Sequence, residues 1–130
     1  MIVLDTHVWL WWINQTLESK RPGWNDAIHA APRLGVSAIS CFEVAWLERH
    51  GRIELPCLRA EWFEKALTGS GVEMLPISHD IASRAVDLPE HHRDPQDRII
   101  IATALAHEAS LISADGKFAL YEELAGRLIR

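Results

Sequence analysis

Short apolar runs alternate with longer segments of helical periodicity along this chain, and that alternation most constrains its fold. The apolar runs at residues 2–4, 35–38, 72–76 and 111–112 have strand length and are separated by helical stretches. Parallel strands need a crossover connection, and the crossover helices then cover the faces of the sheet. The sequence therefore predicts an α/β fold, a three-layer α/β/α sandwich with a mainly parallel sheet.

The helical stretches and a last short strand complete this organisation. We expect helices over residues 6–13, 24–31, 41–50, 58–67, 78–87, 95–109 and 118–124, and an edge strand over residues 127–130. The stretch from Pro95 to Ala109 is apolar on nearly every side beyond its first turn, as a central helix packed against the sheet would be.

Length and charge limit the organisation and the partners of the chain. With 130 residues, of which 48% are hydrophobic and 24% charged, there is room for one core, so we expect a single domain over residues 1–130. The formal net charge of -5 excludes a generally basic protein that attracts polyanions through its long-range field. A nucleic-acid partner would have to be held by local contacts.

Cysteine usage and the N-terminal segment point to the cytoplasm. Cys41 and Cys57 provide neither a disulfide framework nor the paired-cysteine spacing of a zinc site, so we expect reduced thiols. The N-terminus lacks the positive region of a signal peptide, and the apolar run at residues 8–13 is far too short to span a bilayer. We expect a cytoplasmic protein with no membrane partner.

Four acidic residues fall at the ends of expected elements. They are Asp5, Glu43, Asp97 and Asp115. Asp5 and Asp115 follow the first and fourth expected strands, whereas Glu43 and Asp97 lie in the first turns of expected helices. Open α/β folds place their sites at the carboxyl edge of the sheet, where such ends meet. The four side chains are therefore expected to converge there.

Each of these acids also has a purely structural explanation. Residues 40–43, with the sequence SCFE, have the pattern of a capping box that would account for Glu43. Residues 94–97, with the sequence DPQD, resemble an N-cap, a first-position proline and an acid in the first helical turn. Capping by Asp5 and a turn at Asp115 are the corresponding alternatives. Only the coincidence of four acids at one edge favours a functional site.

Clustered carboxylates indicate a bound cation. They repel one another and raise one another's pKa, a cost that a cation offsets. An all-oxygen set without cysteine suits Mg²⁺, or alternatively Mn²⁺, and such ions also take phosphate oxygens from a substrate. The chemistry that this arrangement favours is phosphodiester hydrolysis by an activated water.

Four stretches of the sequence span essentially the whole chain and read, in order, VLDTHVWLWW, SAISCFEVAWL, HRDPQDRIIIATALA and LISADGKF. Together and in this order they resemble the PIN-domain family, and especially VapC-type toxins of bacterial type II toxin–antitoxin pairs. The resemblance implies a PIN-like α/β/α fold and a metal-dependent ribonuclease site. It also implies RNA as substrate, a cognate antitoxin as protein partner, and a toxin homodimer.

Matched by motif, the four acids carry over as the family's acidic quartet. We hypothesise that Asp5, Asp97 and Asp115 hold Mg²⁺, directly or through water. Glu43 then orients or deprotonates the attacking water. The supporting candidates are Thr6 and Ser113, as hydroxyl groups, and Asp94, as a helix cap or a water-linked site residue.

A basic rim and a tryptophan cluster suggest where partners bind. The candidate RNA contacts are His92, Arg93 and Arg98, with a solvated loop as the alternative. Trp9, Trp11 and Trp12 cannot all lie on one face of a helix, so at least one should reach the surface and be available to an antitoxin.

Two other functions compete with a toxin ribonuclease. A catalytically silent PIN-like binding scaffold would lack some of the acids, and all four are present. A metal-dependent hydrolase of small phosphate esters would use the same carboxylates and differs only in having a closed pocket instead of an open groove.

Overall fold

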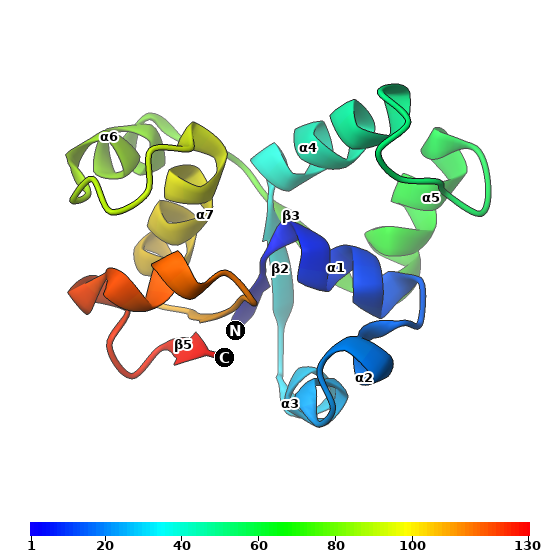
Figure 1. The fold of residues 1–130 in the computed structure, drawn as a ribbon, viewed down its shortest axis with the longest axis horizontal. Helices are drawn as coiled ribbons and strands as arrows, with labels where there is room; N and C mark the ends of the chain where they lie inside the picture. Colours follow the sequence, from blue (N-terminus) through cyan, green and yellow to red (C-terminus); the bar gives the residue numbers. More distant parts are fainter.

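Five short strands form one parallel sheet at the centre of the computed structural model, which describes residues 1–130 (Figure 1). The strands are β1 (Ile2–Leu4), β2 (Leu34–Ser37), β3 (Val72–Leu75), β4 (Ser110–Ile112) and β5 (Leu128–Ile129). Their order across the sheet is β3-β2-β1-β4-β5, and every neighbouring pair is parallel. The expected edge strand is thus present as β5, paired with β4.

Seven α-helices and three 3₁₀-helices connect the strands. The α-helices are α1 (Thr6–Ile13), α2 (Leu17–Lys20), α3 (Trp24–Ala30), α4 (Ala38–Arg49), α5 (Arg59–Ala66), α6 (His79–Asp87) and α7 (Pro95–Ala106). The 3₁₀-helices are η1 (Thr68–Ser70), η2 (Gly116–Leu120) and η3 (Glu122–Leu124). None of the helices combines the length and the apolar character that crossing a membrane requires.

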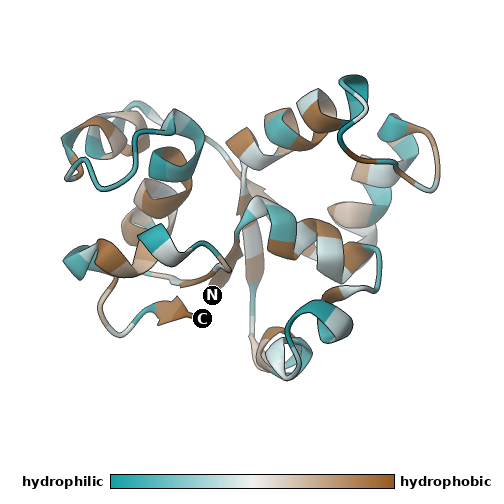
Figure 2. Ribbon diagram, in the orientation of Figure 1, coloured by the Kyte–Doolittle hydropathy of each residue, from teal (hydrophilic) through white to brown (hydrophobic).

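The sheet separates two hydrophobic cores, because successive side chains of a strand point to opposite faces. Ile2 and Leu4 of β1 belong to the core under α1, α2 and α3, whereas Val3 between them belongs to the core under α6 and α7. The two groups of helices lie on either side of the sheet (Figure 1), and hydrophobic residues concentrate toward it (Figure 2). The predicted three-layer α/β/α fold with a parallel sheet is confirmed.

The start of α4 differs from the expectation. The sequence predicts a strand to residue 38 and a helix from residue 41, but β2 ends at Ser37 and α4 begins at Ala38. Ser37 is the N-cap, and its side chain accepts a hydrogen bond from the Ile39 amide at 3.2 Å. The expected capping box at residues 40–43 is therefore wrong, and Glu43 lies in the second turn of α4 instead of the first.

Other boundaries shift for local reasons. The helix expected over residues 95–109 ends at Ala106, because the chain turns at Glu108 with a positive φ of 51° before entering β4. The helix expected over residues 118–124 is instead two 3₁₀ turns, η2 and η3. One short helix, α2, was not expected.

Candidate active site

Asp5 and Asp115 are positioned by two neighbouring parallel strands. The register pairs Leu4 of β1 with Ile112 of β4, so the residues that follow these strands meet at one edge. Asp5 is the N-cap of α1, and Asp115 is the N-cap of η2. Their local capping functions are thus real, and they coexist with the convergence that the sequence predicts.

Asp5 is a buried carboxylate held on both oxygens. Oδ1 accepts from the Thr6 amide at 2.8 Å, and Oδ2 accepts from the Ser113 hydroxyl at 2.7 Å. Burial raises the pKa of Asp5, and the hydrogen bonds from Ser113 and Thr6 oppose this rise by stabilising the ionised form. Ser113 also accepts from the Asp115 amide at 3.0 Å, so one hydroxyl joins the ends of β1 and β4.

Glu43 reaches the same edge from α4. Thr6 Oγ1 donates to Glu43 Oε1 at 3.0 Å and lies 2.9 Å from the buried Ser40 Oγ. Burial raises the pKa of Glu43, the Thr6 hydrogen bond lowers it, and the charge of Asp5 raises it further. Thr6 therefore fixes the carboxylate of Glu43, and Ser40 packs between helices instead of capping one.

Asp97 is the residue on which the charges of the site converge. It lies in the first turn of α7, behind the Asp94 N-cap, whose side chain accepts from the Gln96 amide at 2.9 Å. Burial raises the pKa of Asp97 to about 8, and the nearby carboxylates, in decreasing order of effect, contribute further: Asp5, Asp94, Glu43 and Asp115. The other three predicted acids therefore all act on Asp97 at one sheet edge, and Asp94 adds a further negative charge.

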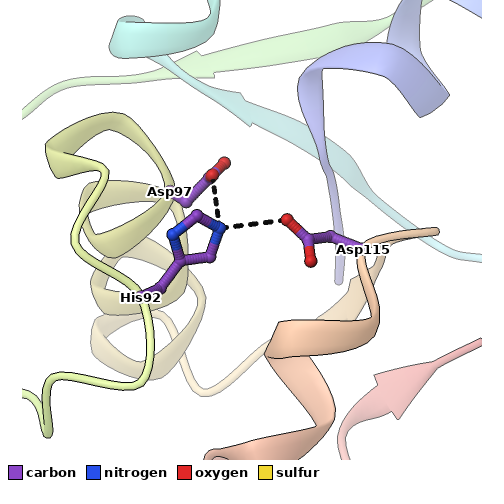
Figure 3. Close-up of side chains that lie close together, drawn as sticks. All are labelled: His92, Asp97 and Asp115. Atoms are coloured by element: carbon purple, nitrogen blue, oxygen red, sulfur yellow. Dashed lines mark hydrogen bonds and ion pairs between the residues drawn. The ribbon is translucent and has the colours of Figure 1, made fainter.

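His92 lies between two of these carboxylates (Figure 3). Its Nε2 is 2.8 Å from Asp97 Oδ2 and 3.0 Å from Asp115 Oδ2. The imidazole is buried, with 8% of the residue exposed, so His92 is a member of the acidic site and not part of an exposed basic rim. The alternative of a solvated loop is therefore wrong for this side chain, and its contact with RNA stays a prediction.

The hydrogen-bond network assigns the tautomer of His92. The Asp94 amide donates to Nδ1 at 3.4 Å, so Nδ1 is the acceptor and Nε2 carries the proton shared with the two carboxylates. The Tyr121 hydroxyl accepts from the His92 amide at 2.9 Å and ties its backbone to the end of the chain. Sequence reasoning missed this function because nothing local distinguishes His92 from His91.

Arg98 has a structural function in the connection between α6 and α7, and its predicted contact with RNA phosphate stays a prediction. Its Nη1 donates to the carbonyls of Pro89 and His92, each at 3.0 Å. Its Nη2 donates to the carbonyls of Val86 at 3.0 Å and Leu88 at 2.7 Å. All four terminal N–H groups of the guanidinium are therefore engaged by the α6–α7 connection. Of the expected rim, only Arg93 remains exposed.

The donor set fits a hard divalent cation. One ligand atom from each of His92, Asp97 and Asp115 lies within 4.8 Å of the others. The carboxylates of Asp97 and Asp115 suit Mg²⁺ and Mn²⁺, whereas the protonated Nε2 of His92 supports them as a donor and not as a ligand. Asp5 is not in this group, so its place among the ligands stays a prediction from the sequence. Burial is the main cause of the raised pKa values of Asp5, Glu43 and Asp97, and neighbouring carboxylates raise them further, so a cation bound here would favour the ionised forms.

Comparison with known proteins identifies the family. The model of the PIN domain matches residues 2–124. The chain is 36% identical to Ribonuclease VapC22 of Mycobacterium tuberculosis over 115 residues, which are 88% of this chain and 86% of that protein. The chain therefore belongs to the PIN-domain family, and the resemblance to its VapC-type members is confirmed.

Two solved structures have the same fold. A toxin–antitoxin complex from Klebsiella pneumoniae contains a chain that matches with a TM-score of 0.67 and 26% identity, covering 100% of this chain and 97% of that one. The structure of VapBC2 from Rickettsia felis, bound to a DNA fragment from their promoter, matches with a TM-score of 0.70 at 19% identity, covering 99% and 98%.

Proposed function

We propose that this protein is a metal-dependent endoribonuclease and the toxin of a toxin–antitoxin pair. The observation that carries the proposal is the convergence of four carboxylates around Asp97, at the carboxyl edge of a PIN-type sheet. The identity shared with a ribonuclease along most of the chain supports RNA as the substrate. A silent scaffold would have no reason to keep so unfavourable a cluster of buried acids.

We assign each residue of the site a separate function in phosphodiester hydrolysis. Asp5, Asp97 and Asp115 hold the divalent cation, and Mg²⁺ or Mn²⁺ supplies charge stabilisation and a more acidic water when bound. Glu43 accepts the proton of the attacking water, and its raised pKa makes it a better base near neutral pH than an ordinary glutamate. Thr6 orients Glu43 through the 3.0 Å hydrogen bond.

Neighbouring side chains fix the positions of the acids relative to one another. Ser113 donates to Asp5 and accepts from the Asp115 amide, so its hydroxyl fixes two of the proposed ligands relative to each other. His92 donates its Nε2–H between Asp97 and Asp115 and limits their repulsion. Asp94 caps α7 and thereby sets the position of Asp97 three residues later.

An antitoxin is the proposed protein partner. The solved relative from Klebsiella pneumoniae is a toxin–antitoxin complex, which supports this assignment. Trp9 is fully buried and Trp11 and Trp12 are half-buried, so the expected surface tryptophan of α1 is only partly exposed. Trp46 of α4 is more accessible, with 42% of its surface exposed. A cytoplasmic location and a homodimer complete the proposal, and light scattering would test the dimer.

Cleavage of a mixed cellular RNA pool by the protein free of any antitoxin tests the proposed activity. We expect discrete cuts with Mg²⁺ that disappear with EDTA and in Asp5→Asn, while Asp26→Asn, which removes an exposed acid of α3, cuts as the wild type does. Absence of cutting by a folded wild-type protein would contradict the proposal. Turnover of small phosphate esters under the same conditions would instead favour the alternative hydrolase.

A further inference from the structure

A small cationic pocket adjoins the acidic site on its Asp115 side. Its walls include Ser113 and Asp115 at the end of β4, together with Arg21, Trp24 and Arg130. The cavity volume is about 330 Å³, at the lower end of the range for small-ligand pockets, which suits a phosphate and its adjoining sugar. The pocket thus lies directly beside two residues of the candidate active site.

Sheet register explains why Arg130 is in this pocket. β5 runs parallel to β4, with Ile112 paired to Ile129, and the Ser113 amide donates to the Ile129 carbonyl at 3.2 Å. Arg130 is therefore the residue that leaves β5 at the edge where Ser113 leaves β4. Acids follow the neighbouring strands β1 and β4, and a cation follows β5.

Arg21 approaches from the opposite end of the chain. It lies in the turn between α2 and α3, and its guanidinium carbon is 5.5 Å from the ring centroid of Trp24. Trp24 is buried in the core, so the ring offers a fixed surface for the guanidinium. The side chain of Arg21 is exposed and makes no hydrogen bond or ion pair within the protein, so its N–H donors are available to a ligand.

Both arginines are free to bind an external anion. Arg33, Arg59 and Arg84 form ion pairs with glutamate or aspartate, whereas neither Arg21 nor Arg130 takes part in any ion pair of the structure. Two exposed guanidinium groups beside a cluster of carboxylates, in a chain of net charge -5, provide the local attraction that a polyanion needs here. Planar guanidinium groups match phosphate oxygens especially well.

We propose that Arg21 and Arg130 form a phosphate-binding subsite, which holds a backbone phosphate of single-stranded RNA next to the bond cleaved at the acidic site. This inference rests on the proposed ribonuclease function and adds to it the position of the substrate backbone. The strand passes the Asp115 side of the site, and the pocket binds any sequence because it contacts phosphate and not base edges.

Salt-dependent binding of a short labelled single-stranded RNA tests the subsite. The measurement is fluorescence anisotropy in EDTA, in an Asp97→Asn background that lowers repulsion and prevents cleavage. We expect Arg21→Gln and Arg130→Gln each to weaken binding several-fold, and the double variant to reduce the slope of log K against log salt by about 0.7, the value for one phosphate contact. Arg127→Gln is the matched control, because it removes the same charge before β5 instead of after it.

Two comparisons separate the subsite from the proposed activity. Pocket variants that bind RNA with the affinity and salt slope of Arg127→Gln would overturn the subsite, even if the wild type cleaves RNA. In the cleavage assay we expect the double variant Arg21→Gln/Arg130→Gln to raise KM about tenfold at nearly unchanged kcat. A wild type that binds RNA through the pocket but never cuts it would overturn the ribonuclease and retain the subsite.

Discussion

The ionisation of Asp97 is unfavourable in the folded protein. Its side chain is 18% exposed, and burial together with the surrounding carboxylates raises its pKa from 3.8 to about 8. Between these two values the folded protein binds a proton that the unfolded chain releases. Stability linked to this residue is therefore largest below pH 4 and declines as the pH rises through the folded-state pKa.

Without divalent cations, we expect the free energy of unfolding of the wild type to fall by a few kcal/mol more than that of Asp97→Asn as the pH rises from 5 to 8. The physical reason is that the asparagine of this variant cannot ionise, whereas Asp97 must give up its proton against four nearby carboxylates. Urea unfolding in EDTA at several pH values measures the difference. Parallel pH profiles for the two proteins would show that the cost of ionising Asp97 is small.

A second prediction at this scale concerns the histidine between the carboxylates. In His92→Ala the Nε2–H shared by Asp97 and Asp115 is lost, so ionisation of Asp97 becomes less favourable. We expect the acidic limb of the kcat/KM profile to move to higher pH and the activity at pH 7 to fall by up to about tenfold, the change that corresponds to about 1.4 kcal/mol. His91→Ala, which alters the exposed neighbour packed against Tyr121, should leave the profile in place. If both variants gave the wild-type profile, His92 would have no positioning function.

At the scale of elements, Arg98 connects α6 to α7. A single side chain donates to four carbonyls between Val86 and His92, which holds the segment that delivers His92 to the acids. These carbonyls lie at the end of α6 and in the loop beyond it, where backbone acceptors have no helical partner. The guanidinium of Arg98, which comes from α7, thus holds this loop in place through hydrogen bonds to its backbone.

Removal of this side chain should therefore affect both stability and activity. We expect Arg98→Ala to lower the free energy of unfolding by about 2–3 kcal/mol, because several partly buried carbonyls lose a charged donor. Arg98→Lys should recover only part of the loss, since an ammonium group cannot span four acceptors as the planar guanidinium does. Urea denaturation of the three proteins gives the comparison. Equal stabilities would mean that water replaces the guanidinium without cost.

Helix α4 shows where local sequence patterns fail. Residues 40–43 have the pattern of a capping box, and yet Ser40 is buried as the third residue of the helix, with its Oγ 2.9 Å from the Thr6 Oγ1. The N-cap is Ser37, three residues earlier, and Ser40 instead contacts Thr6, 34 positions away, so the local pattern does not show which of the two serines caps the helix. The local cap at Asp94, by contrast, is predicted correctly, because the two partners of its hydrogen bond are two residues apart.

In the candidate site, too, some positions follow from local sequence patterns and others depend on tertiary contacts. Asp5 and Asp115 could be placed from the sequence, because strand ends of a parallel sheet converge whatever the details of packing. The inward position of His92 and the turning of Arg98 toward backbone carbonyls depend on how the α6–α7 connection packs against Tyr121 and Phe118. Residue types alone do not predict these tertiary contacts. From the sequence, a histidine and an arginine beside an acidic motif suggest an exposed basic rim.

For the whole molecule, the parallel sheet is what assembles a site from distant segments. Asp5 and Ser113, joined by a 2.7 Å hydrogen bond, are 108 positions apart, and Glu43 and Asp97 arrive on helices from opposite faces of the sheet. Binding of a cation at this edge is therefore coupled to folding of both layers. A ligand that binds only the folded chain adds RT ln(1 + [L]/Kd) to its stability.

We expect Mg²⁺ to stabilise the wild type against thermal unfolding, by about 2.7 kcal/mol at a concentration one hundred times its Kd. The gain should be larger at pH 8 than at pH 6, because Asp97, with a pKa of about 8, must lose its proton before it can bind the ion. Asp5→Asn should lose the gain, whereas Asp26→Asn on the exposed part of α3 should keep it. Thermal melts with and without Mg²⁺ at both pH values provide the measurement. An equal gain in Asp5→Asn would contradict the assignment of Asp5 as a ligand of the ion.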